Sequence, residues 1–167
     1  MIVGNGDIAS VLPDRDDLVF FASGVSNSGD QPESEYRREV ALLSRQPRNK
    51  RLVYFSSLSV FYSDSRYARH KHTMEDVVRK YSKYYCIIRL GNISWGNNPH
   101  TLINHFKNQI AKGERLTIEN TYRYILDMEE FLAWIDMIPN WNCEMNLPGR
   151  RLKVEEIARE YAGFHYN

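Results

Sequence analysis

The alternation of apolar and amphipathic segments between residues 18 and 93 constrains the fold of this chain more than any other feature. The apolar segments, DLVFFASGVSNSG, RLVYFSSLSVF and YYCIIRLGNI, are continuous enough to be strands buried on both faces of a sheet. The segments between them, at about 33–45 and 67–83, have helical spacing. Strands that alternate with helices form a parallel, doubly wound sheet, which binds ligands at the carboxyl ends of its strands. We therefore predict an α/β fold.

The pattern becomes less regular beyond residue 99. TLINHFKNQIAKG predicts a helix, RLTIE a short strand, and YRYILDMEEFLAWIDMI a strand that leads into a helix capped by Asp127, with Glu130 three residues later. CEMNLP and VEEIAREYAGF predict a last strand and helix. A length of 167 residues with 43% apolar residues suits one packed domain. We expect a single domain over residues 1–167, with residues 99–167 forming a small lobe.

The charge and the apolar pattern exclude several classes of partner. A net charge of +1 gives no reason to expect nucleic acid, and the basic stretch RQPRNKR is a solvated loop or, as the alternative, a phosphate-binding patch. No apolar run has the length of a membrane span and no signal-peptide pattern is present, so we expect a soluble, cytoplasmic protein. Cys86 and Cys143 predict buried thiols, and no metal is expected at His70 and His72, which face different sides of a helix.

A glycine-rich turn, GNGDIA, lies between a very short apolar strand and a brief helix that ends before Pro13. Glycines in such a G-x-G-x-x-A turn let the backbone approach a pyrophosphate, and the next helix offers it free N–H groups. The turn therefore predicts a dinucleotide site, with a plain tight turn between strand and helix as the alternative.

Tyr67 and Lys71 have the i, i+4 spacing that places two side chains on one face of a helix. A lysine there would lower the pKa of the tyrosine from about 10 toward neutrality, which suits proton transfer. Ser56, Ser57 and Ser59 come just before, at the end of an apolar strand. Their hydroxyls can orient a substrate oxygen or, as the alternative, simply satisfy a turn.

Together these motifs resemble, in composition and order, the extended short-chain dehydrogenase/reductases, the NAD(P)-dependent epimerase/dehydratase family that acts on nucleotide sugars. GNGDIA is similar to the dinucleotide turn of the family, VFFASGVSNS to its VIHLAA strand, YFSSLSVF to ISSxxVYG and YARHK to YxxxK. IIRLGNISWG resembles LRPxNVYG, YRYILDMEEF resembles RDFIxVDDL, and EMNLPGRRLKVEEIARE resembles xYNLGxGxxxSVxELA. The resemblance runs from residue 1 almost to the C-terminus.

The resemblance implies a truncated, Rossmann-like, doubly wound sheet with a C-terminal substrate-binding lobe. It also implies hydride transfer between a sugar carbon and NAD or NADP, in which Tyr67 exchanges the hydroxyl proton, Lys71 holds the nicotinamide ribose and Ser57 orients the oxygen. Ser59, Asn92 and Arg123 would bind a nucleotide sugar or other small substrate. The residues implied to bind the cofactor are Gly4, Asn5, Gly6, Asp7, Ile8, Ala22, Ser23 and Gly24, with Tyr67 and Lys71.

The chain departs from the family pattern in its N-terminal part. Only SVLPDRDD stands where the family inserts a strand, a helix and another strand. The acidic residue that holds the adenosine ribose, about 20 residues past the turn, would fall near Asp30, beyond the next strand. Asp14, Asp16 and Asp17 lie near enough to substitute for it or, as the alternative, simply end the helix and form the loop. Glu39 replaces a family asparagine.

The missing strand-helix-strand unit leaves two interpretations of the function open, and it also affects the oligomeric state that we expect. One is a compact oxidoreductase or epimerase, and the other is a catalytically reduced protein that binds nucleotides or serves in assembly. The first strand would become an unpaired edge, which favours a subunit contact. The resemblance implies a homodimer formed through the helices at about 33–45 and 67–83.

Overall fold

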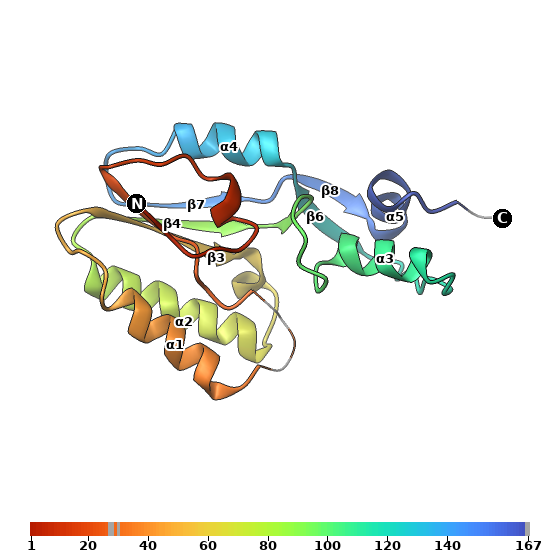
Figure 1. Ribbon diagram of the computed structural model, residues 1–167, viewed down its shortest axis with the longest axis horizontal. Coiled ribbons are helices and arrows are strands. Elements are labelled where there is room, and N and C mark those ends of the chain that lie inside the picture. Colours follow the sequence, from red (N-terminus) through yellow and green to blue (C-terminus); the bar gives the residue numbers. More distant parts are fainter. Residues whose placement is uncertain (27–28, 30, 166–167) are drawn as a thin grey trace.

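The computed structural model describes residues 1–26, 29 and 31–165, so Asp30 and the end of the segment VFFASGVSNS lie outside the described residues. Figure 1 shows a sheet flanked by helices, with a smaller group of elements at one end. The strands β1 (Ile2–Val3), β2 (Leu18–Phe21), β3 (Arg51–Ser57), β4 (Tyr85–Leu90) and β7 (Cys143–Leu147) form a five-stranded sheet in that order. All the neighbouring pairs are parallel. The predicted α/β, Rossmann-like sheet is confirmed, and β1 is an edge strand.

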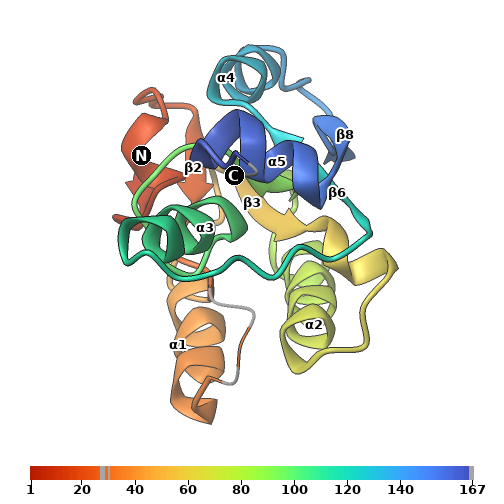
Figure 2. The same cartoon turned by 90° about the vertical axis from the view of Figure 1, so that its right-hand side faces the viewer.

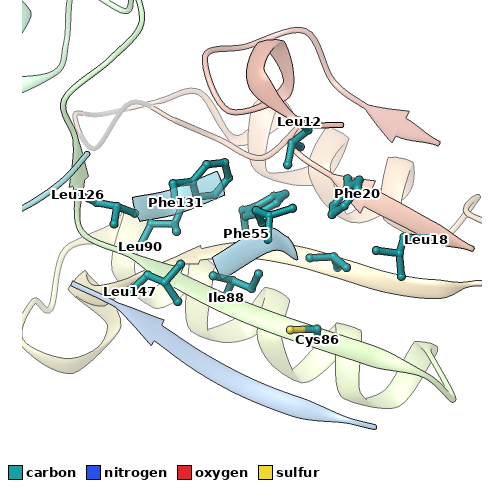
Figure 3. Close-up of a cluster of buried hydrophobic side chains, with 12 residues drawn as sticks. Leu12, Leu18, Phe20, Phe55, Cys86, Ile88, Leu90, Leu126, Phe131 and Leu147 are labelled. Carbon is teal, nitrogen blue, oxygen red and sulfur yellow. The ribbon is translucent and has the colours of Figure 1, made fainter. Parts of the chain in front are cut away.

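Helices cover both faces of this sheet because its strands are apolar on both sides. Helices α1 (Glu33–Leu43) and α2 (Arg66–Tyr81) lie on one face (Figure 1). Helix α4 (Met128–Asp136) and the N-terminal segment that contains the 3-10 turn η1 (Ala9–Val11) lie on the other. Figure 3 shows Phe20, Phe55 and Phe131 packed together in the core between α4 and the sheet, and Cys86 and Ile88 farther along β4. The fully buried strand residues Val19, Phe21, Leu52, Tyr54 and Ile87 belong to the cluster on the α1 and α2 side.

The small lobe contains a second sheet. Strand β6 (Tyr122–Leu126) pairs in parallel with β5 (Asn92–Ile93) and antiparallel with β8 (Arg150–Lys153). Helices α3 (Leu102–Ala111) and α5 (Val154–Ala162) pack beside each other on it, as the view along the long axis shows (Figure 2). Helix α4 and β7 belong to the main body, so the lobe is interrupted in sequence and does not take up the whole of residues 99–167.

One strand prediction was wrong, and one helix cap was correct in position only. RLTIE forms no strand, because Leu116 and Ile118 pack against the cluster of Phe106 without a partner strand among the described residues. Asp127 is the N-cap residue of α4, as predicted, but its side chain makes no cap bond and instead accepts hydrogen bonds from the Tyr161 hydroxyl at 3.0 and 3.2 Å.

Strand β8 was not predicted, since RRLK has almost no apolar pattern, and neither was the two-residue β5. Within the part of the chain that the structure describes, no helix has both the length and the apolar character needed to cross a membrane.

Candidate functional site

A cavity of about 730 Å³ opens at the carboxyl ends of β1, β2, β3 and β4. The strand ends meet there because the four strands are parallel and adjacent. Most residues that the sequence predicted to form a site line this cavity. They are Asn5, Gly6, Asp7, Ile8, Ala22, Ser23, Gly24, Ser57, Ser59, Tyr67, Lys71 and Asn92. Gly4 and Arg123 do not line it.

Gly4 serves the packing of the sheet. Its φ is +128°, and a Cβ there would lie 2.5 Å from the carbonyl oxygen of Ala22, so only glycine lets the turn pass this close to the end of β2. A Cβ at Gly6 would meet no atom within 4 Å, which leaves the turn open to the cavity at this residue.

The first turns of α2 position Tyr67 and Lys71. Ser65 caps the helix by accepting a hydrogen bond from the Ala68 N–H at 3.2 Å. Tyr67 follows in the first turn and Lys71 one turn later, and the Lys71 Nζ lies 5.8 Å from the centre of the Tyr67 ring. The two side chains therefore share one face of the helix and one cavity, as their spacing predicted.

Lys71 is buried, and its ammonium is paired with a carboxylate. The Lys71 Nζ lies 3.2 Å from the Glu39 Oε1 and 3.2 Å from the Tyr54 hydroxyl oxygen. Lys71 is 3% exposed and Glu39 is 0% exposed. Gly24 makes room for this pair, because a Cβ there would lie 2.4 Å from the Lys71 Nζ. The cation expected to act on Tyr67 therefore has a full counter-charge beside it.

Glu39 is the centre of a buried hydrogen-bond network. It accepts bonds from the Tyr54 hydroxyl at 2.7 Å and the Val25 N–H at 2.8 Å, and His70 Nε2 lies 3.0 Å from its Oε2. Burial raises the pKa of the Glu39 carboxyl, but the charge of Lys71 and these hydrogen bonds outweigh burial and lower it to about 2. Sequence reasoning noted Glu39 only as a departure from an asparagine, because its partners lie on other elements.

This network predicts a dependence of stability on acid. The folded-state pKa of Glu39 lies below its ordinary value, so its ionised form stabilises the fold above about pH 4.5, and this contribution is lost as the pH falls toward 2. We expect the free energy of unfolding to fall over that window, and to fall less in Glu39→Gln. Urea denaturation at about pH 7 and about pH 3 measures both changes. Equal losses in the two proteins would contradict this assignment.

The serines at the end of β3 have different surroundings. The Ser56 hydroxyl donates to Glu75 at 2.7 Å, within a buried network that also contains Arg89. The Ser57 Oγ accepts a hydrogen bond from the Ser59 N–H at 3.2 Å. The Ser59 Oγ is buried and has no hydrogen-bond partner among the described residues, which suits a site for a ligand oxygen.

Asn92 and Arg123 are held by contacts within the small lobe. The Asn92 side chain donates to the backbone oxygen of Tyr124 at 3.0 Å. Arg123 donates to Glu119 at 3.0 Å and also to Thr121. The sequence predicted that Arg123 contacts the substrate phosphate. In the structure its guanidinium does not line the cavity and is already paired with the carboxylate of Glu119.

Asp7 connects the glycine turn to the loop that follows β5. Its two carboxylate oxygens accept the N–H groups of Asn97 and Asn98, each at 3.0 Å, and its backbone oxygen accepts the Trp95 Nε1–H at 3.1 Å. The contact is close, since a Cβ at Gly96 would lie 2.1 Å from the Asp7 Cγ. The carboxylate of the predicted dinucleotide turn thus holds a loop of the protein itself.

Replacing Asp7 with alanine is expected to release this loop without unfolding the sheet. Two charge-assisted hydrogen bonds disappear, so the amides of Asn97 and Asn98 should exchange about 10- to 100-fold faster. Amide hydrogen exchange resolved by NMR measures the effect. Asp16→Ala, an exposed change in the loop before β2, is the control and should leave both amides unchanged. Protection that persists at both amides in the Asp7 variant would contradict the assignment.

No protein-family model matches the chain, and no curated protein matches it either. Solved structures do match. The Bordetella bronchiseptica enzyme WbmG, in complex with NAD and UDP, is 16% identical with a TM-score of 0.70, over 90% of this chain and 58% of its own. UDP-glucose 4-epimerase from Thermotoga maritima, with UDP-glucose, is 15% identical with a TM-score of 0.68, over 90% and 62%.

A third structure is UDP-N-acetylglucosamine 4-epimerase from Methanobrevibacter ruminantium M1, in complex with UDP-N-acetylmuramic acid. It is 18% identical with a TM-score of 0.65, over 92% of this chain and 61% of its own. At such identities the likeness is one of fold, and it confirms the resemblance in fold inferred from the motifs. The chain spans 58% to 62% of the length of these three proteins.

Proposed function

We propose, from a fold shared with nucleotide-sugar epimerases, that this protein binds a nucleotide sugar and a nicotinamide cofactor and interconverts the sugar by oxidation and reduction at carbon. The observation that carries the proposal is the meeting of Ser57, Tyr67 and Lys71 with the glycine turn around one cavity at the carboxyl ends of the parallel strands.

The residues present fit the nicotinamide-ribose half of NAD or NADP. Tyr67 and Lys71 would hold the ribose from α2, and the backbone at Gly6 and Ser23 would line the approach. When bound, the nicotinamide ring supplies the acceptor and donor of hydride. We propose NAD and NADP alike.

Within this proposal the chain itself moves a proton and orients the sugar. Tyr67 would take the proton of the sugar hydroxyl as the phenolate, acting as general base, and return it as the phenol, acting as general acid. The Ser57 hydroxyl would donate to the same sugar oxygen, and the unpartnered Ser59 Oγ offers a second contact. Asn92, at the cavity wall, would contact the substrate phosphates.

Titration with NADH and NADPH, followed by quenching of tryptophan fluorescence, tests the proposal. Saturable quenching is expected because Trp95 is hydrogen-bonded to Asp7 in the cavity wall. The absence of saturable binding at millimolar cofactor would contradict the proposal.

A second candidate function is a nucleotide-binding protein with little or no turnover. The ion pair between Lys71 and Glu39 favours it, because the positive charge that would assist proton transfer at Tyr67 is already paired with a buried carboxylate. Cofactor binding without conversion of any UDP-sugar would support this candidate, whereas conversion that disappears in Tyr67→Phe would exclude it.

A cytoplasmic homodimer is the remaining part of the proposal. The outer faces of α1 and α2 are the expected contact, and the edge strand β1 is a second. Sedimentation equilibrium tests the dimer against a chain mass of 19.7 kDa.

A further inference from the structure

We infer, on the basis of the proposed function, that the cofactor side of the cavity recognises a single nucleotide: a nicotinamide mononucleotide moiety, to which the adenosine half of a dinucleotide adds no binding energy. Three features of the chain lead to this inference. They are the wall of the cavity, the charge at the glycine turn, and the position of Arg38, whose partly exposed guanidinium belongs to the cavity lining.

The wall of the cavity ends at the glycine turn. None of residues 9–21, all of which the structure describes, lines the cavity. In a complete dinucleotide fold, the adenosine lies over strands on the far side of the first strand, and an acidic residue about 20 positions past the turn binds its ribose. Here β1 is the edge of the sheet, and the segment after the turn contributes Ala9 and Leu12 to the core instead. An adenosine would therefore extend beyond the protein.

The glycine turn is not followed by a full helix whose N-terminus could bind a pyrophosphate. Only a three-residue 3-10 turn follows it, and the Ser10 N–H donates to the Gly6 carbonyl at 3.0 Å. The Asp7 carboxylate lines the cavity beside the turn and adds a negative charge. Because that carboxylate also fixes the loop at Asn97 and Asn98, it cannot turn away without loss of two hydrogen bonds.

The cavity retains a cation on the opposite side of the turn. Among the described lining residues, the groups able to carry positive charge are Arg38, Lys71 and His100. Lys71 is buried against Glu39, whereas the Arg38 side chain is 43% exposed. The Arg38 guanidinium donates to the Oγ and the backbone oxygen of Ser23, both at 3.2 Å, and to the Glu35 Oε2 at 3.0 Å, so it is fixed at the end of β2. The Glu35 side chain is partly exposed, so water screens this ion pair more than the buried pair of Lys71. A guanidinium in this position suits the two oxygens of a phosphate monoester.

The test compares reduced nicotinamide mononucleotide with NADH on the unmodified protein, with the fluorescence of the reduced ring as readout. We expect dissociation constants within about threefold of each other, and no competition by AMP, because the adenosine half makes no contact. Binding of NADH more than about tenfold tighter, or displacement by AMP, would overturn the inference and leave the proposed function standing. If neither reduced nucleotide bound, both would be overturned.

A matched pair of variants tests the phosphate contact. Arg38→Gln should weaken binding of the reduced mononucleotide by about tenfold or more, because it removes a charged hydrogen-bond donor. Arg37→Gln is the control: this neighbour on α1 is 80% exposed, pairs with Glu33 and lies outside the cavity, so binding should not change. If the two variants bound the reduced mononucleotide with equal affinity, Arg38 would not be a phosphate contact and this part of the inference would be overturned.

Discussion

Replacing Tyr67 with phenylalanine is expected to lower the rate of sugar oxidation and reduction about 100- to 10,000-fold, the usual contribution of a positioned acid-base group. The change removes one oxygen from a half-buried side chain and leaves its ring, so the fold should be preserved. The measurement is formation of reduced cofactor or of epimer from a panel of UDP-sugars, together with circular dichroism of the variant.

Tyr62→Phe provides the control for this experiment. Tyr62 also lines the cavity and also loses one phenol oxygen, but it lies outside α2 and has no lysine one helical turn away. Its loss should change the rate little. If both variants lost activity equally, or if Tyr67→Phe kept full turnover, the proposed acid-base role of Tyr67 would be wrong.

Replacing Glu39 with glutamine is expected to lower the free energy of unfolding by about 3–5 kcal/mol. The amide keeps the shape of the side chain, but its single oxygen can accept only one of the two bonds that the Tyr54 hydroxyl and the Val25 N–H donate to separate carboxylate oxygens. It leaves the ammonium of Lys71 buried without a counter-charge, and this cost dominates. Urea denaturation at neutral pH measures the loss.

Two further variants identify the origin of that loss. Glu35→Gln, on the same helix, removes a partly exposed pair with Arg38 and should cost no more than about 1 kcal/mol. The double variant Glu39→Gln with Lys71→Met removes both buried charges and should recover much of the stability. A double variant less stable than Glu39→Gln alone would show that the uncompensated charge is not the cause.

The elements of the main sheet could be predicted because their signals are local. Continuous apolar segments such as RLVYFSSLSVF predict strands buried on both faces, and alternation with helices predicts a parallel sheet. The same logic predicts which residues line the cavity, because parallel strands bring their carboxyl ends together. It failed at RLTIE and RRLK, where pairing depends on which strand edges are free.

The ion pairs and hydrogen bonds around the predicted site could not be predicted from the sequence. Lys71 and Glu39 are 32 residues apart, and Asp7 and Asn98 are 91 apart, so no spacing rule connects them. Cys86 and Cys143 are likewise separate in sequence, yet their sulfurs lie 3.3 Å apart because β4 and β7 pair in register.

The sequence by itself determined the succession of strands and helices between residues 18 and 90, the glycine turn, and the face of α2 that carries Tyr67 and Lys71, because each depends on residues within one segment. Only the tertiary structure decided that Lys71 forms an ion pair with Glu39, that Asp7 holds a loop, and that none of residues 9–21 lines the cavity. The reason is physical: burial and electrostatic pairing depend on distances between elements, and those distances exist only once the sheet has assembled.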